Sequence, residues 1–157
     1  MKDLNFIQNA FKEAVMKYNA NEFLGNLMFN SKMKSMTQSD WDKVLNYVNN
    51  LNFPLIIYRG FALEDKNDLD MSDLGTSWTI DKELFRSSNS AFRNYNFVVI
   101  AEVDESQIDW PETIFNYIHY SLKDISTRYP ETEITLKEHT TPKKIIGVYS
   151  KEEIFNI

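Results

Sequence analysis

The chain has 157 residues, with 17 Lys or Arg against 23 Asp or Glu, and its formal net charge is −6. A chain of this length can bury a core of its own and fold as one domain without disulfides or metals. It contains no cysteine, which excludes a disulfide scaffold, a zinc ribbon, a thiol nucleophile and an iron–sulfur site. The two histidines, His119 and His139, disfavour a histidine metal cluster, and we expect no metal.

Glycine content and charge exclude further classes of protein. The four glycines are scattered, so neither a dinucleotide-binding G-x-G-x-x-G turn nor a phosphate-binding P-loop can be written. The acidic balance argues against general binding to nucleic acids or anionic membranes, because both depend on clustered Lys and Arg. Polar side chains interrupt the first residues, and no window approaches 18 apolar residues. We therefore expect a cytoplasmic protein without a membrane partner.

The first third of the chain has the periodicity of helices. Apolar residues recur at steps of three and four over Leu4–Tyr18, which predicts an amphipathic helix. A second apolar stripe over 41–51 follows Thr37 and Ser39, either of which can cap a helix N-terminus. The segment between the two is polar and irregular, and it leaves open a short helix around 22–29.

After Pro54 the pattern changes to that of β-strands. Short β-branched or alternating runs predict four strands, at 55–58, 97–101, 132–137 and 144–149. Between the second and third strands, Trp110 and Pro111 begin a further amphipathic run, which predicts a helix with proline in its first turn.

The order of these elements predicts the fold class. Helices come first and strands later, without the regular alternation of a doubly wound sheet, and this order favours an α+β fold. We expect a single domain over 1–157, helical over 1–53 and strand-rich over 54–157.

An arginine and a glycine end the first predicted strand, where Tyr58 precedes Arg59 and Gly60. Arg59 can be a charged residue that extends from the strand end into water. It can also be a fixed guanidinium that binds a phosphate through two hydrogen bonds, at a place where Gly60 lets a ligand approach the backbone. These residues alone leave both interpretations open.

A hydroxyl-rich segment follows Gly75 and consists of Thr76, Ser77, Trp78 and Thr79. It can form an edge strand in front of a helix capped by aspartate. It can also be a cluster of hydroxyls that positions a ligand or another catalytic side chain.

Two glutamates, Glu131 and Glu133, enter the third predicted strand. Residues two positions apart in a strand point to the same face, with their side-chain bases roughly 7 Å apart. The pair can be a solvated strand edge. It also suits an acid/base couple at a glycosidic carbon, where one carboxylate stabilises an oxocarbenium-like centre and the other handles a proton.

In chain order, the three segments resemble the mono-ADP-ribosyltransferases of the R-S-E class, an arginine-modifying group that includes bacterial toxins, vertebrate ecto-transferases and small phage enzymes. The resemblance covers about residues 54–149. It rests on Arg59, on Ser77 in a segment that replaces the family's Ser-Thr-Ser, and on the E-x-E of Glu131 and Glu133. It implies N-terminal helices packed on a two-sheet mixed β core with an NAD cleft.

The resemblance also implies catalytic roles, with NAD as co-substrate and no metal. Glu133 would bind the ribose 2′-hydroxyl and stabilise the oxocarbenium ion as nicotinamide leaves. Ser77 would orient this glutamate, and Glu131 would position and help deprotonate the acceptor guanidinium. Arg59 would hold the phosphates of the dinucleotide.

Further residues complete the implied NAD site: Tyr58, Gly60, Thr76, Trp78 and Phe85. Phe85 is a candidate to stack on nicotinamide, although Phe92 and Phe97 compete for this role.

The loop over 124–130 would correspond to the family's segment that contacts the target protein. Tyr129 and Arg128 are the contact candidates in this loop, and packing of Tyr129 against Pro130 is the alternative.

We therefore expect a mono-ADP-ribosyltransferase that modifies a side chain of a target protein, arginine in the first instance. The expected setting is a phage or bacterial effector that acts on host machinery in the cytoplasm, with nucleic acid disfavoured as a partner. An NAD glycohydrolase and a non-catalytic inhibitor or interaction module on the same fold are the alternatives. Intact Arg59, Ser77 and Glu133 argue against the non-catalytic module.

Overall fold

The computed structural model describes residues 1–86, 92–122 and 132–156. These residues form an α+β fold, as predicted, with four α-helices and a five-stranded antiparallel sheet. In these ranges, no helix is long and apolar enough to span a bilayer.

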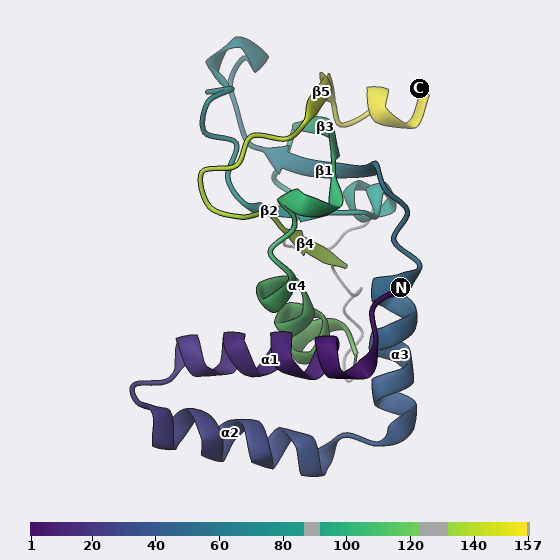
Figure 1. Ribbon diagram of the computed structural model, residues 1–157. Helices are drawn as coiled ribbons and strands as arrows, with labels where there is room; N and C mark the ends of the chain where they lie inside the picture. The colour runs from purple at the N-terminus through teal and green to yellow at the C-terminus, as the bar shows by residue number, and fades with distance from the viewer. Residues whose placement is uncertain (87–91, 123–131, 157) are drawn as a thin grey trace. The chain divides into compact units, whose positions relative to one another are not determined.

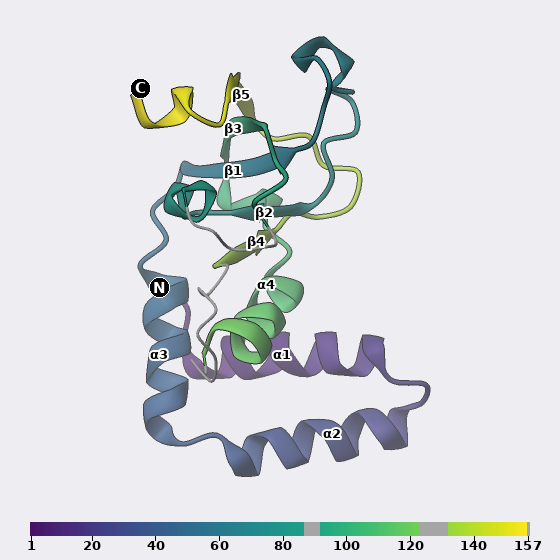
Figure 2. The same cartoon turned by 180° about the vertical axis from the view of Figure 1, so that it is seen from behind.

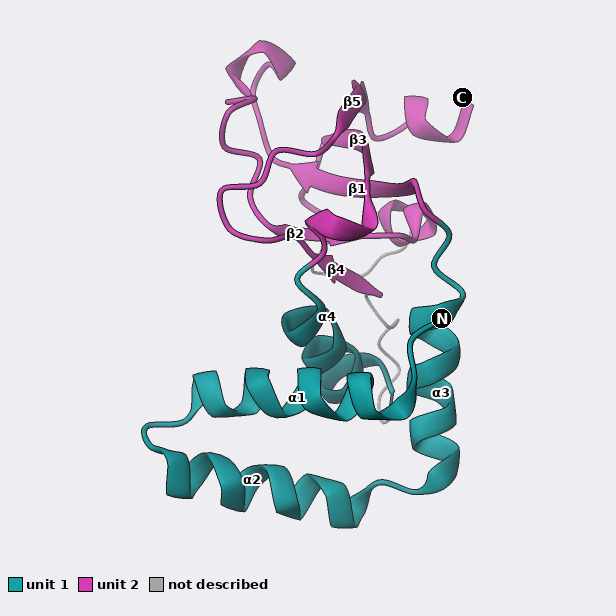
Figure 3. Ribbon diagram, in the orientation of Figure 1, with its two compact units in different colours: residues 1–52, 109–123 teal, residues 53–108, 124–157 magenta. Residues whose placement is uncertain are grey.

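The chain divides into two compact units, shown in Figure 3. The helical unit contains residues 1–52 and 109–123, and the strand unit contains 53–108 and 124–157. The sequence led us to place everything after residue 53 in one strand-rich part. The difference arises because the buried side chains of 114, 118 and 122 belong to the same apolar core as those of the N-terminal helices.

Three helices form the first stretch of the helical unit: α1 over Leu4–Tyr18, α2 over Glu22–Ser35 and α3 over Gln38–Asn49. α1 and α2 lie side by side in opposite directions (Figure 1). The side chains of Asp3, Asn21 and Thr37 cap the three N-termini by accepting backbone N–H bonds. α2 is longer than the short helix around 22–29 that the sequence left open. Its apolar residues do not follow one stripe, so the periodicity could not predict its full length.

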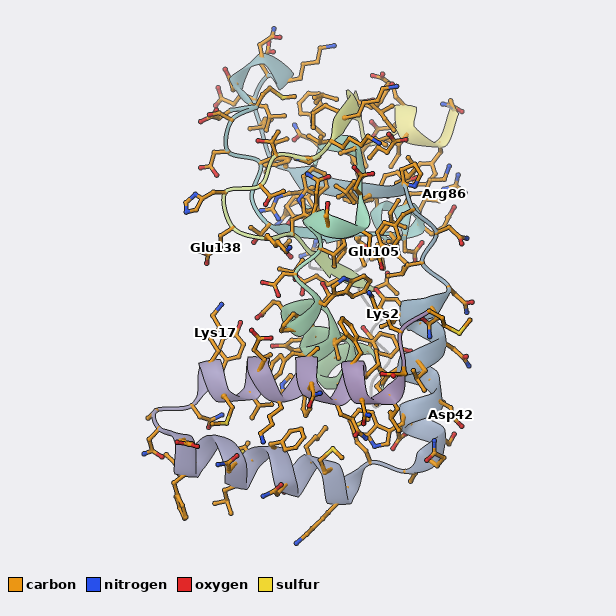
Figure 4. All side chains as sticks on the ribbon, viewed as in Figure 1. Lys2, Lys17, Asp42, Arg86, Glu105 and Glu138 are labelled. Carbon is orange, nitrogen blue, oxygen red and sulfur yellow. The ribbon has the colours of Figure 1, made fainter. Side chains whose placement is uncertain are left out.

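The helical unit is completed by α4 (Trp110–Asn116), which continues into a π-helical turn over Tyr117–Ser121. Aromatic rings hold α4 against α1, since the ring centroids of Phe11 and Phe115 are 5.9 Å apart and nearly parallel. The N-terminus is also anchored, because the ammonium of Lys2, labelled in Figure 4, lies 4.4 Å from the ring centroid of Phe6 and 4.8 Å from that of Trp110.

The strand unit is built on one antiparallel sheet in the order β4-β2-β1-β3-β5 (Figure 2). Its strands are β1 (Leu55–Phe61), β2 (Ser77–Thr79), β3 (Phe97–Val103), β4 (Glu133–Thr135) and β5 (Lys144–Ser150). A short 3-10 helix follows β2 and another follows β5. Val98 and Ile100 of β3 form a buried cluster with Phe85 and Ile154.

The sheet differs from the two-sheet mixed core that we expected. Among the described strands, all pairings are antiparallel and belong to one sheet. It has two parts of unequal length, because β1, β3 and β5 have seven residues each and β2 and β4 have three. A single pair in register, Tyr58 with Thr79, joins these parts.

Candidate functional site

A pocket of about 120 Å³ opens in the strand unit where the two parts of the sheet meet. Residues from three strands and from the turn before β3 line it: Tyr58, Arg59, Gly60, Ser77, Trp78, Thr79, Phe92, Tyr95 and Glu133. Six of these residues follow one another along β1 or β2. The pairing of β2 with β4 brings Glu133 to them, and Phe92 and Tyr95 lie in the turn before β3.

The register of β2 and β4 places the polar residues of the pocket on one face. Thr79 lies opposite Glu133, so their side chains share a face of the sheet, and Ser77 shares it because strand residues alternate. Trp78 and Ile134 lie on the other face, where they are 2% and 0% exposed. The short pair of strands therefore separates a polar face from an apolar one.

Three predicted residues form a continuous line of hydrogen bonds in this pocket. The hydroxyl of Ser77 donates to Oε1 of Glu133, and Nη1 of Arg59 donates to the backbone carbonyl of Ser77. Ser77 is thus the central member, with its backbone tied to the arginine and its side chain tied to the glutamate.

Arg59 is partly buried, and its surroundings act on its pKa in opposite directions. Loss of water contact lowers the pKa of the guanidinium, while Tyr95, Glu133 and Asp73 act to raise it. In the described part of the chain, Nε of Arg59 is buried without a hydrogen-bond partner. An acceptor atom that reached this nitrogen would satisfy a donor that the protein leaves unpaired.

The turn before β2 packs closely against the guanidinium of Arg59. Gly75 has a positive φ of 81°, and a Cβ placed on it would lie 3.0 Å from Nη2 of Arg59. The indole N–H of Trp78 donates to the carbonyl of Gly75 over 3.0 Å and holds the turn closed. Trp78, which we predicted to bind the cofactor, thus has a buried ring that anchors the turn behind the pocket.

Aromatic rings form the wall of the pocket near the end of β1. Phe92 and Tyr95 have ring centroids 5.8 Å apart and lie almost perpendicular. Gly60 permits this arrangement, because a Cβ at this position would collide with the Tyr95 ring. Phe85, our first candidate for stacking on nicotinamide, is 1% exposed and packs edge-on behind Phe92 at 5.1 Å.

The structure brings together six of the predicted site residues in the pocket: Tyr58, Arg59, Gly60, Ser77, Trp78 and Glu133. Thr76 is outside the lining and serves the sheet, since its carbonyl accepts the N–H of Leu136 at 2.8 Å. The predicted residues Glu131, Tyr129 and Arg128 lie outside the described residues.

Sequence reasoning missed Tyr95 and left Thr79 without a role of its own. The hydroxyl of Thr79 lies 3.2 Å from that of Thr132 and accepts the N–H of Asp81 at 3.1 Å, so it braces the end of the pair where β2 ends and β4 begins. The alternation of β2 was a signal for Thr79. No local pattern marks Tyr95, which enters the pocket through a turn fixed by distant residues.

The arrangement offers a carboxylate, a hydroxyl and a guanidinium beside an aromatic wall. Within the described ranges, no group of three or more His, Asp or Glu residues is placed to hold a metal ion. Comparison of the chain with family models, with curated proteins and with solved structures found no match.

Proposed function

We propose that the chain is a mono-ADP-ribosyltransferase, which transfers ADP-ribose from NAD to a side chain of a target protein and releases nicotinamide. The observation that carries the proposal is the line of hydrogen bonds from Arg59 through Ser77 to Glu133. These residues are 18 and 56 positions apart in sequence and meet in one pocket. They are also the residues on which the resemblance to the R-S-E transferases rests.

A carboxylate held by a hydroxyl suits the cleavage of the nicotinamide–ribose bond. When this C–N bond breaks, its electron pair leaves with nicotinamide and positive charge develops on the ribose ring. A carboxylate already fixed at that position stabilises the charge without reorganising during the reaction. Glu133 would supply the carboxylate and Ser77 would fix its orientation.

The acceptor then forms a bond to the same ribose carbon and loses a proton. An arginine acceptor holds its proton firmly at neutral pH, so it becomes a nucleophile only when a carboxylate orients it and takes its proton. We assign this role to Glu131, two residues before Glu133, on the resemblance alone.

Arg59 and the aromatic wall would bind the co-substrate. The unpaired Nε of Arg59 gains an acceptor if a phosphate or ribose oxygen reaches it. The rings of Phe92 and Tyr95 offer apolar surface to a flat ring. At about 120 Å³ the pocket is smaller than the ~300 Å³ of sites that enclose a whole small ligand, so it would hold one end of NAD.

The distribution of charge favours a basic target. The helical unit contains seven Lys and seven Asp or Glu, so the net charge of −6 falls entirely on the strand unit. Such a field attracts a positively charged partner to the unit that carries the pocket. We propose a cytoplasmic effector, of a phage or a bacterium, whose target is a host protein that displays arginine.

Incubation of the purified protein with labelled NAD and a host lysate tests this function. Label on a protein supports the transferase. Free ADP-ribose without labelled protein would indicate an NAD glycohydrolase, in which water replaces the acceptor. Recovery of neither product would refute both activities, and would favour a non-catalytic interaction module.

Substitution of the two glutamates sharpens the test. Glu133→Gln should abolish nicotinamide release and transfer together, while Glu131→Gln should lose arginine transfer and keep hydrolysis. Glu138→Gln is the matched control, since Glu138 is an exposed glutamate beyond β4. Equal loss of both activities in Glu131→Gln and Glu133→Gln would contradict the division of roles.

A further inference from the structure

The turn that carries the aromatic wall is held by a lysine from the far end of the chain. Lys151 follows β5 directly. Its ammonium donates to the carbonyl of Phe92 over 3.1 Å and lies 3.4 Å from the carbonyl of Arg93. Its backbone N–H donates to the carbonyl of Asn96 over 2.9 Å. One residue thus binds both ends of the segment over 92–96.

Asn96 fixes the same segment to the chain that leaves β1. Its side-chain amide donates to the carbonyl of Leu63 over 2.5 Å, and its side-chain oxygen accepts the N–H of Leu63 over 2.9 Å. Its backbone N–H donates to the carbonyl of Phe61 over 3.0 Å. The C-terminal end of the turn is therefore tied to β1 independently of Lys151.

The N-terminal end of the turn depends on Lys151. The carbonyl of Phe92 accepts two bonds, from the ammonium of Lys151 and from the N–H of Tyr95 at 3.3 Å. A charged donor strengthens such a bond relative to a neutral one. Because the Phe92 ring is attached to this residue and meets the Tyr95 ring, the position of the wall follows from the position of this carbonyl.

We propose that Lys151 is a positioning residue for the ligand pocket, which holds Phe92 and Tyr95 against the line formed by Arg59, Ser77 and Glu133. It acts through the backbone of the turn and does not line the pocket. The proposal rests on the proposed function, because it takes NAD as the ligand that the wall receives.

Three variants test this role. Lys151→Met removes the donors and keeps an unbranched apolar stem of similar length. Lys151→Arg retains donors that can reach the same carbonyls. Lys144→Met is the matched control, because Lys144 is an exposed lysine at the start of the same strand. Thermal unfolding of each variant establishes that it is folded before any other measurement.

Hydrogen exchange of the Tyr95 and Asn96 amides reads the turn itself, without any ligand. A bond to a charged donor corresponds to roughly tenfold or more in a local opening equilibrium. We expect exchange at Tyr95 to rise about tenfold in Lys151→Met, with Lys151→Arg close to wild type and Lys144→Met unchanged. Unchanged exchange at Tyr95 in Lys151→Met would overturn the proposal.

Steady-state kinetics with NAD read the consequence for the pocket. A wall that binds ground state and transition state alike should affect KM more than kcat. We expect Lys151→Met to raise KM for NAD about tenfold, with kcat within about threefold of wild type, and Lys151→Arg to restore KM. Faster exchange at Tyr95 with unchanged KM would also overturn the positioning role. A wild-type protein without NAD turnover would instead refute the proposed function, and exchange alone would then decide whether Lys151 holds the turn.

Discussion

Replacing Ser77 by alanine removes the link between the hydroxyl segment and the carboxylate of Glu133. The hydroxyl of Ser77 donates to an ionised acceptor, and a hydrogen bond of this type contributes about 1.5–3 kcal/mol. If the bond orients Glu133 during nicotinamide departure, its whole value appears in the barrier. Each 1.36 kcal/mol corresponds to a factor of ten, so kcat for nicotinamide release should fall by about ten- to a hundredfold.

The stability of the protein should change much less than its activity. Ser77 is exposed, so water replaces the lost donor in the folded state, and exposed substitutions usually stay within about 0.5 kcal/mol. Release of labelled nicotinamide measures the first effect, and urea unfolding measures the second. We therefore expect Ser77→Ala to lose nicotinamide release while its free energy of unfolding stays close to that of the wild type.

Ser72→Ala is the matched control for Ser77→Ala. Ser72 also donates its hydroxyl to a carboxylate, that of Asp70 at 2.6 Å, and this exposed pair is outside the pocket. This bond and a second one from the backbone N–H of Ser72 hold the pKa of the Asp70 carboxyl below its usual value. Ser72→Ala should therefore leave nicotinamide release unchanged. Wild-type turnover in Ser77→Ala, or an equal loss in Ser72→Ala, would refute the assignment of Ser77.

Three further changes test the fold. Burial raises the pKa of Tyr117 above its usual value near 10, so the phenol ionises at lower pH in the unfolded chain than in the folded one. The free energy of unfolding that this phenol contributes is therefore fully present below the unfolded pKa and is lost as the pH rises through the folded pKa. Tyr117→Phe should reduce the decline in urea midpoint between pH 8 and 10.5. His139 has a φ of 59°, and His139→Gly should be about 1–2 kcal/mol more stable than Glu138→Gly in urea unfolding. Asn49 exchanges two hydrogen bonds of 2.9 Å with the backbone of Lys2, and Asn49→Ala should lose about 1–3 kcal/mol of unfolding free energy.

Each of these tests has an outcome that contradicts its reasoning. An alkaline decline of the same steepness in Tyr117→Phe would mean that this phenol is not the group that ionises on unfolding. Equal stabilities of His139→Gly and Glu138→Gly would deny a cost to the left-handed backbone at His139. An Asn49→Ala variant as stable as wild type would show that the N-terminal residues contribute nothing through this pair.

The sequence predicted elements well where one apolar stripe or one β-branched run decided them. α1 has the predicted bounds, and α3 begins after Thr37 as its capping signal indicated. It predicted α2 poorly because Phe23 and Leu27 are 74% and 56% exposed, so burial does not select a stripe on this helix. The division into units could not be predicted either, because it depends on which distant helices share a core.

For the candidate site, the sequence identified the polar residues but not the wall. Ser77 and Glu133 begin β2 and β4, and Arg59 lies within β1, where polar side chains beside apolar runs are visible without a structure. Strand pairing then decides that they meet, and no single-sequence signal specifies that β2 lies between β1 and β4. Tyr95 could not be predicted, because Lys151, a residue more than fifty positions away, holds its turn.

The two-part composition of the helical unit sets the order in which the molecule can assemble during synthesis. Its residues 1–52 emerge from the ribosome first, but residues 109–123 complete its core. The 56 intervening residues, 53–108, belong to the strand unit, and at typical elongation rates they take roughly 3 to 11 s to appear. Through this interval the buried faces of α1 and α3 lack their partner from α4 and are open to water or to chaperones. A ribosome-bound chain that ends before residue 109 should therefore expose more apolar surface than one that ends after residue 123.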